Sequence, residues 1–333
     1  MELANLNQNF VGTPVRSSSF SFVYSIRIGI VGYGKLGQYL VEQIINDGQK
    51  YRLDLAFIWN RTALSEETRS KILIRCPLVK FLEAVNQINE IDLVDLIVEV
   101  CHPEIVKQYA ELFLDKADFL IGSPSALADQ EFSQKLTDKL ATCHHRMFVA
   151  RGALWGANDI QMMARRNRLQ TVEIRMGFHP RSLRLQDAKL RELNDELIKQ
   201  DSLNNNNNDN NNASPPPPRS IVLYEGPARE LCHIAPNNSN TVATAALLGV
   251  GFDHTIGKLI SDTSLCDFHR IEIIVRGKPT IDDKQFQVEL NRQSPTHSAH
   301  NVSSLHTFES FWHSILHCTG SFIRANNLEI QVC

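Results

Sequence analysis

Apolar runs and amphipathic stretches alternate along residues 25–155 of the chain. The amphipathic stretches have helical spacing. In residues 37–47 this spacing places Leu40, Ile44 and Ile45 on one face of a predicted helix, which we expect to end at Gly48. The apolar runs are short and uninterrupted, as is typical of buried strands, and occupy residues 26–32, 53–60, 94–100, 118–123 and 146–152. This alternation predicts an α/β fold with a doubly wound parallel sheet of the Rossmann type.

Beyond residue 155 the pattern changes, because candidate strands follow one another with fewer helices between them. They lie at 171–178, 220–226, 254–261, 268–277 and 285–292, and residues 240–249 have helical character. We therefore predict a second, α+β domain with an open, mostly antiparallel or mixed sheet and helices on one face. The predicted division is a disordered tail at 1–24, a dinucleotide-binding domain at 25–155, and a substrate domain at 156–333 with a disordered Asn- and Pro-rich insertion at 204–218.

Composition and charge exclude several classes of partner. Hydrophobic residues make up 43% of the 333 residues, charged residues 21%, and the net charge is -3. Neither nucleic acid nor an anionic membrane surface is therefore an expected partner. No apolar run approaches the ~20 residues that span a bilayer, and the first residues lack the features of a secretory signal. The seven cysteines include no Cys-x-x-Cys pair, so we expect no zinc site, no disulfide framework and a cytoplasmic protein.

Three glycines separate the first apolar run from the helix that follows it. Gly32, Gly34 and Gly37 form the pattern Gly-x-Gly-x-x-Gly, with Lys35 and Leu36 inside it. Such a loop turns tightly, lets a pyrophosphate approach the backbone, and directs the N–H groups of the helix N-terminus towards it. A purely structural turn is the alternative. The strand, the helix and the repeated alternation around the motif favour a site for NAD or NADP.

The following strand ends carry further candidates. Asn60 and Arg61 stand where a carboxylate for the 2′-hydroxyl of NAD is usual, and an arginine there can pair with the 2′-phosphate of NADP. We expect NADP to be accepted without excluding NAD, a solvated loop residue being the alternative for Arg61. His102 follows the third predicted strand, at the edge where ligands of open α/β sheets bind. We expect it to contact the cofactor or to pack, rather than to catalyse.

A second group of polar residues lies in the later half of the chain. Asn238-Ser239-Asn240 precedes an Ala- and Leu-rich helix, where one capping residue would suffice, so the extra amide indicates a ligand. His269 lies just inside a predicted strand. A histidine titrates near pH ~6.5 and can exchange protons at neutral pH, although a strand histidine is by itself more often structural.

These motifs together resemble the L-aspartate dehydrogenase family, and within it the animal-type branch of aspartate dehydrogenase domain-containing proteins. The resemblance spans about residues 26–318 and rests on VGYGKLGQ, WNR, VEVCHP, GSPSAL, FVARGALWGANDI, LYEGPAR, APNNSNTVATAAL and SDTSLCDFHRIE. It implies a Rossmann domain followed by an α/β domain, and NAD(P)-dependent oxidation of L-aspartate to iminoaspartate. The imine would hydrolyse to oxaloacetate and ammonia, or feed a synthase that makes quinolinate on the way to NAD.

The resemblance also implies roles for particular residues. The active-site histidine of the family matches His269, with Asp267 replacing the more familiar asparagine two positions before it. A carboxylate there would favour the protonated ring. The family's cofactor contacts match Ala153 and either Asn238 or Asn240. We expect His269 to take a proton from the substrate ammonium group and then to activate the water that attacks the imine.

Two other functions fit the same sequence. The scaffold would suit a dehydrogenase of another amino acid, or a non-catalytic NAD(P)H sensor or scaffold in which His269 is dispensable. For the favoured small-molecule substrate, L-aspartate, the candidates to bind its carboxylates are Arg151, Arg181 and Arg184. No set of metal ligands is recognised, and we expect a homo-oligomer, a dimer formed by pairing of the open second sheet.

Overall fold

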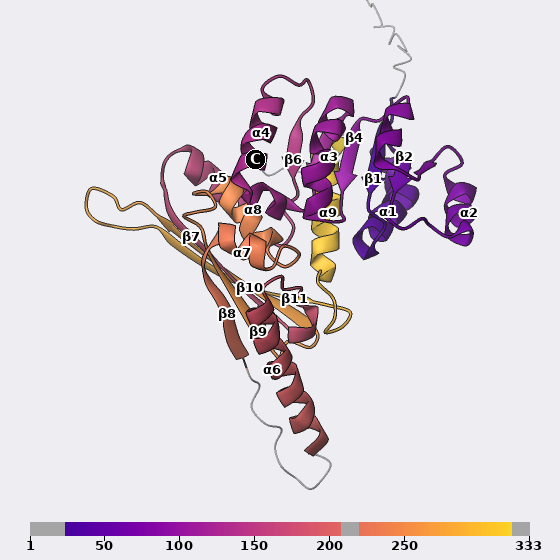
Figure 1. Ribbon diagram of the computed structural model, residues 1–333. Coiled ribbons are helices and arrows are strands. Elements are labelled where there is room, and N and C mark those ends of the chain that lie inside the picture. Colours follow the sequence, from indigo (N-terminus) through magenta and orange to yellow (C-terminus); the bar gives the residue numbers. More distant parts are fainter. Residues whose placement is uncertain (1–23, 208–219, 322–333) are drawn as a thin grey trace, which may run out of the picture.

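The computed structural model describes residues 24–207 and 220–321 (Figure 1). Residues 1–23 of the predicted tail and 208–218 of the predicted insertion lie outside the described residues. Residues 204–207 belong to the end of a helix, α6 (Ala188–Asn207).

Six parallel strands form the first sheet, in the order β3-β2-β1-β4-β5-β6. They are β1 (Ile26–Val31), β2 (Leu53–Trp59), β3 (Lys80–Leu82), β4 (Leu96–Glu99), β5 (Asp118–Ile121) and β6 (Met147–Val149). This order confirms the Rossmann-type prediction and places the topological switch between β1 and β4, where open α/β sheets bind ligands. The sequence patterns missed β3, because a three-residue edge strand has no periodicity to detect.

Helices cover both faces of the first sheet. On one face α1 (Lys35–Tyr51) buries Leu40 and Ile44 against β1, and on the other α3 (Pro103–Lys116) buries Phe113. The remaining helices of this part are α2 (Glu66–Arg75), α4 (Gln130–Leu140) and the 3-10 helices η1 (Val85–Glu90) and η2 (Pro124–Ala128).

The prediction that α1 ends at Gly48 is wrong, because the helix continues to Tyr51 and ends at Arg52, whose φ is 58°. A Cβ on Gly48 would lie 2.5 Å from the carbonyl oxygen of Leu53. Gly48 is therefore an interior residue of α1 that lets the helix pass close to the start of β2.

The second sheet has five strands in the order β11-β10-β7-β9-β8, with β7 and β9 parallel and the other neighbours antiparallel. The predicted mixed, mostly antiparallel sheet is thus confirmed. Helices α5, α7 and α8 pack against one of its faces (Figure 1). The elements are β7 (Leu169–Phe178), β8 (Ser220–Pro227), β9 (Ile256–Asp262), β10 (Phe268–Gly277), β11 (Gln287–Pro295), α5 (Ala157–Arg165), η3 (Pro180–Ser182), α7 (Ala228–Ile234) and α8 (Asn240–Leu248).

After β11 the chain returns to the first sheet. Helix α9 (Leu305–Cys318), yellow in Figure 1, packs against α1 and buries Phe311, Trp312 and Ile315 in the same core cluster as β1. Residues 296–304 therefore link an element of the second sheet to an element packed on the first. The predicted domain boundary near residue 155 stays a prediction. Within the described ranges, no helix has the length and apolar character needed to cross a membrane.

Candidate functional site

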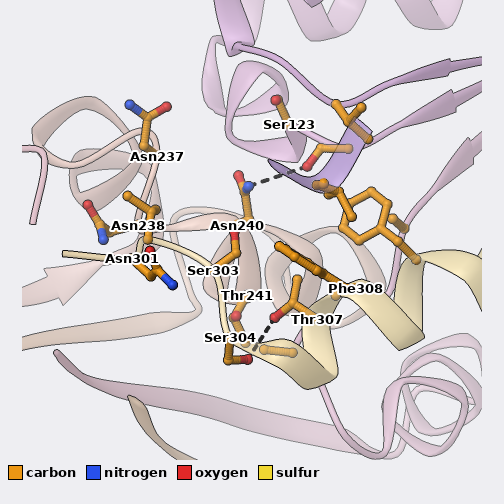
Figure 2. A pocket seen from close by; sticks show the side chains of 18 of the residues that line it. Ser123, Asn237, Asn238, Asn240, Thr241, Asn301, Ser303, Ser304, Thr307 and Phe308 are labelled. Carbon is orange, nitrogen blue, oxygen red and sulfur yellow. Dashed lines mark hydrogen bonds between the residues drawn. The ribbon is translucent and has the colours of Figure 1, made fainter. Parts of the chain in front are cut away.

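A cleft of about 470 Å³ lies between the carboxyl ends of the first-sheet strands and the start of β10. Its walls come from the loops after β1, β4 and β5, the N-terminus of α8, strands β10 and β11, and residues 300–308. Figure 2 shows polar side chains of three of these segments around the space, among them Ser123, Asn240 and Thr307. The cleft thus lies at the edge where the Rossmann architecture predicts a ligand.

The glycine loop forms one wall of the cleft and is shaped by close backbone contacts. Gly32 has φ +112°, a left-handed conformation that favours glycine. A Cβ on Gly37 would lie 2.0 Å from the Gly32 carbonyl oxygen, so a side chain there would push α1 away from the turn. A Cβ on Gly34, by contrast, meets no described protein atom within 4 Å. Space is therefore open in front of Gly34, whereas Gly37 is enclosed.

The N-terminus of α1 faces this open space. Gly34 is its N-cap and provides no side-chain acceptor, and the first turn contains no acidic residue. Gly34, Lys35 and Leu36 line the cleft, whereas Gly32 and Gly37 shape the turn behind it. Free backbone N–H groups with no competing carboxylate make a binding place for an anionic group such as a pyrophosphate.

Asn60 and Arg61 lie beside the loop rather than in the wall of the cleft. The Asn60 side chain accepts from the Tyr33 backbone N–H at 2.9 Å and donates to the Thr62 carbonyl at 2.8 Å. It thereby ties the end of β2 to the glycine loop. Arg61 is exposed at this end.

Glu99, at the carboxyl end of β4, is fully buried and accepts five hydrogen bonds. Its Oε1 accepts from the backbone N–H groups of Cys101 and His102 and from the Ser123 hydroxyl, at 2.8, 2.9 and 2.9 Å. Its Oε2 accepts from the N–H groups of Gly122 and Ser123 at 3.2 and 2.9 Å. Burial raises the pKa of Glu99, and these donors oppose the rise. The carboxyl group thus holds together two loops that line the cleft.

His102 lines the cleft and also begins α3. Its Nδ1 accepts from the Glu104 backbone N–H at 3.2 Å, so that the ring caps the helix. Ala153 lines the cleft as well, and its carbonyl accepts from the guanidinium of Arg292.

The two candidate asparagines have different surroundings. Asn238 accepts from the Arg184 backbone N–H at 2.9 Å and donates to the Ser182 carbonyl at 3.3 Å, so both ends of its amide hold a neighbouring loop. Asn240 donates to the Gly122 carbonyl at 3.3 Å, and its Oδ1 is buried without a hydrogen-bond partner in the described structure. A buried acceptor of this kind requires a donor, so Asn240 is the amide with a position left for a ligand.

His269 lies on β10 with a side chain only 5% exposed. Its Nε2 is 3.0 Å from the carbonyl oxygen of Asn301, and its ring packs edge-on against Phe178 at a centroid distance of 4.8 Å. Burial lowers the pKa of His269 to about 4; the positive charge of Arg292 adds to the fall, and the Asn301 hydrogen bond opposes it. The ring is therefore neutral at pH 7 and can accept a proton.

The sequence leaves the effect of Asp267 on this pKa open, and in the structure the pKa of His269 is lowered, with burial as the largest cause. The Asp267 side chain is exposed, whereas the His269 ring is buried. The backbone carbonyl of Asp267 accepts a hydrogen bond from the Thr296 N–H at 2.7 Å. Water around an exposed carboxylate weakens its effect on a buried ring. Burial is the largest cause of the lowered pKa of His269, and the charge that adds to it is that of Arg292.

Residues 300–308 are one part of the site that sequence reasoning missed. His300, Asn301, Ser303 and Thr307 line the cleft, yet no motif marked them, because they follow the second sheet in the chain. Ser304 before an apolar helical stretch does signal a helix start. That signal says nothing of where the helix packs, and the packing of α9 on α1 is what brings the segment to the cleft.

Of the three arginines proposed to bind substrate, Arg184 lines the cleft. Its guanidinium donates to the carbonyls of Arg181 and Leu183, at 2.9 and 3.0 Å. Arg151 and Arg181 are not among the described residues of the cleft wall. Across residues 24–207 and 220–321, no three His, Cys, Asp or Glu side chains gather as a metal site would require.

Comparisons with known proteins agree with this architecture. The family model described as aspartate dehydrogenase, C-terminal, matches residues 159–314, and the NAD-binding domain of homoserine dehydrogenase matches residues 32–150. The chain is 38% identical over 298 residues to an aspartate dehydrogenase domain-containing protein of Xenopus tropicalis, covering 89% of this chain and 95% of that protein.

Two microbial proteins extend the likeness. An L-aspartate dehydrogenase of Psychrobacter cryohalolentis is 28% identical over 228 residues, covering 65% of this chain and 79% of that protein. The crystal structure of aspartate dehydrogenase from Thermotoga maritima matches with a TM-score of 0.58 at 19% identity, covering 93% of this chain and 99% of that one. The last comparison shows a shared fold.

Proposed function

The chain belongs to the aspartate dehydrogenase family, and we propose that it oxidises L-aspartate to iminoaspartate with NADP or NAD. Iminoaspartate then hydrolyses to oxaloacetate and ammonia, or is consumed in NAD biosynthesis. One observation carries the proposal: a buried, neutral His269 lies at the same cleft as the open glycine loop and the uncapped N-terminus of α1. A base and a cradle for a dinucleotide in one cleft are what oxidative deamination requires.

The residues of the cleft fit a nicotinamide dinucleotide. The space in front of Gly34 admits a pyrophosphate, Lys35 lies beside it, and the α1 N–H groups supply donors. The orphaned Oδ1 of Asn240 suits a donor group such as a carboxamide N–H or an ammonium, so we choose Asn240 over Asn238 as the contact. When bound, the cofactor supplies the hydride acceptor.

His269 handles the protons in this proposal. Its neutral ring takes one from the substrate ammonium group, which frees the nitrogen lone pair that drives hydride loss from Cα and forms the imine. The imidazolium releases this proton to solvent water, and the neutral ring then accepts a proton from the water that attacks the imine. A pKa near 4 makes the free ring a weak base. The two substrate carboxylates in the same cleft would raise this pKa, as opposite charges within ~4–6 Å do.

Finer properties belong to the same proposal. Arg61, exposed at the end of β2 with no acidic residue in the α1 first turn, favours NADP over NAD. The position of Arg184 in the cleft wall supports it as the arginine that attracts a substrate carboxylate. The face of the second sheet opposite α5, α7 and α8 carries the charged group Glu173, Arg175 and Glu272, and we propose that it pairs with a second copy in the cytoplasm.

The test mixes purified full-length protein with L-aspartate and either NADP or NAD at mildly alkaline pH and follows the absorbance of the reduced nicotinamide. We expect turnover that is lost in His269→Ala and kept in the control His144→Ala, an exposed histidine outside the cleft wall. Cofactor binding without turnover on aspartate would refute the substrate and favour a sensor or another amino acid. Full turnover in His269→Ala would refute the base.

A further inference from the structure

The segment of residues 296–304 joins the two sides of the cleft. It runs from β11, a strand of the second sheet, to α9, which packs on α1. Asn301 lies in its middle, is 7% exposed and lines the cleft. Figure 2 shows it among the polar side chains that line the cleft, together with Asn238 and Ser303. A buried polar residue at the centre of such a link must have its hydrogen-bonding groups satisfied, and each of its contacts leads to a different part of the site.

The backbone of Asn301 determines the proton position on His269. The Asn301 carbonyl oxygen lies 3.0 Å from His269 Nε2. A carbonyl oxygen only accepts, so Nε2 must carry the hydrogen. In the neutral ring the other nitrogen, Nδ1, then holds the lone pair. This contact therefore chooses which ring nitrogen is able to receive a proton.

The side chain of Asn301 is held from the opposite direction. Its Oδ1 accepts from the ammonium of Lys35 at 2.6 Å and from the Ser298 hydroxyl at 3.5 Å. The bond from Lys35 is short and charge-assisted, which makes it the stronger of the two. Lys35 belongs to the glycine loop at the start of α1. Asn301 thus bridges the glycine loop and the ring of His269 through its side chain and its backbone.

We propose that Asn301 is a positioning residue: anchored to Lys35 by its side chain, it holds His269 as the Nε2–H tautomer and leaves Nδ1 as the proton acceptor. The assignment of Nδ1 as the catalytic atom rests on the proposed function, whereas the tautomer and its dependence on Asn301 do not. A wrong tautomer disables a catalytic histidine even when the ring itself stays in place.

The first test is NMR of the ligand-free full-length protein with ring-15N-labelled histidine, the His269 signals being assigned by their loss in His269→Gln. The unaltered protein should show a protonated Nε2 and an unprotonated Nδ1. Asn301→Ala should show a mixture of tautomers, and Asn301→Asp, which keeps an acceptor for Lys35, should restore the single form. His297→Ala, an exposed residue of the same segment, is the matched control and should change nothing.

Kinetics supply a second readout. In Asn301→Ala, kcat should fall about tenfold or more, since a general base contributes about 10²–10⁴ to the rate and part of the molecules would hold the wrong tautomer. The KM for the cofactor should change less than kcat, and Asn301→Asp should recover most of the loss. An equal loss in the Ala and Asp variants would overturn the role of the Lys35 contact.

If Asn301→Ala does not fold, Lys35→Met tests the same bridge from its other end. Hydrogen exchange of residues 296–304 should rise in this variant compared with Lys71→Met, which removes an exposed ammonium on α2. Unchanged exchange would overturn the inference, as would an Nδ1–H tautomer in the unaltered protein. A single Nε2–H tautomer in a protein that does not oxidise aspartate would leave the bridge standing and refute only the proposed function.

Discussion

Replacing Glu99 with glutamine should destabilise the protein, although the two side chains have almost the same shape. All five of its hydrogen-bonding partners in the described structure are donors. A carboxylate has two acceptor oxygens for them, whereas an amide has one oxygen and an NH₂ group that is itself a donor. Glutamine therefore cannot satisfy the two loops that Glu99 joins.

The cost follows from which donors lose their acceptor. In its better orientation the amide oxygen replaces Oε1 and keeps three donors, while the NH₂ group faces the buried N–H groups of Gly122 and Ser123. Two buried donors left without an acceptor cost about 1–3 kcal/mol each, or about 2–6 kcal/mol together. The amide avoids the burial of a charge, which recovers part of this, so we expect a loss of about 2–4 kcal/mol.

The assay is urea unfolding at neutral pH, with the free energy of unfolding compared among the unaltered protein, Glu99→Gln and Glu83→Gln. Glu83 is an exposed glutamate, and its substitution should stay within about 0.5 kcal/mol. A Glu99→Gln variant as stable as Glu83→Gln would refute the reasoning, because it would mean that the neutral acid already occupies the site or that water replaces the lost acceptor.

Three further outcomes follow from the geometry. Gly34→Val should abolish NADP binding, measured by calorimetry, and leave the Tm unchanged. Gly37→Ala should lower the Tm, because its Cβ would lie 2.0 Å from the Gly32 carbonyl oxygen. NADP binding retained in Gly34→Val would contradict the pyrophosphate site. Because the pKa of His269 falls to about 4, the unfolded chain binds more protons than the folded one between about pH 6.5 and 4. Stability should decrease as the pH falls through that window, by roughly 3 kcal/mol, with a smaller decrease in His269→Gln as the check. Arg61→Ser should raise the Kd for NADP about tenfold or more and leave that for NAD nearly unchanged; equal effects on both would exclude a 2′-phosphate contact.

Much of the fold could be predicted because its signals are local. Each apolar run that became β1, β2, β4, β5 or β6 is short and continuous, and each strand of the second sheet fell within or close to its expected range. The prediction that the helix ends at Gly48 was wrong for a non-local reason: a glycine is needed there because the backbone of Leu53 lies close to it. The strand β3 was not predicted, because three residues are too few to show a hydrophobic periodicity.

The residues of the candidate site likewise fall into those that local sequence motifs marked and those whose surroundings depend on distant parts of the chain. The glycine loop could be located from sequence because all its parts lie within a few residues of one another, and a family resemblance marked His269. Neither route could distinguish the surroundings of Asn240 from those of Asn238. Their difference lies in partners far away in the chain, the Gly122 carbonyl for one and the Arg184 N–H for the other.

The sequence by itself determined the strands β1, β2 and β4 to β11, the glycine loop at the start of α1 and the presence of a histidine on β10. Only the tertiary structure decided the direction of the pKa shift of His269, because burial of the ring is its largest cause. It alone brought Asn301 between Lys35 and His269, by packing α9 on α1. The physical reason is that desolvation and hydrogen-bond partners depend on distances in space, whereas in the chain Asn301 lies 266 positions after Lys35 and 32 positions after His269.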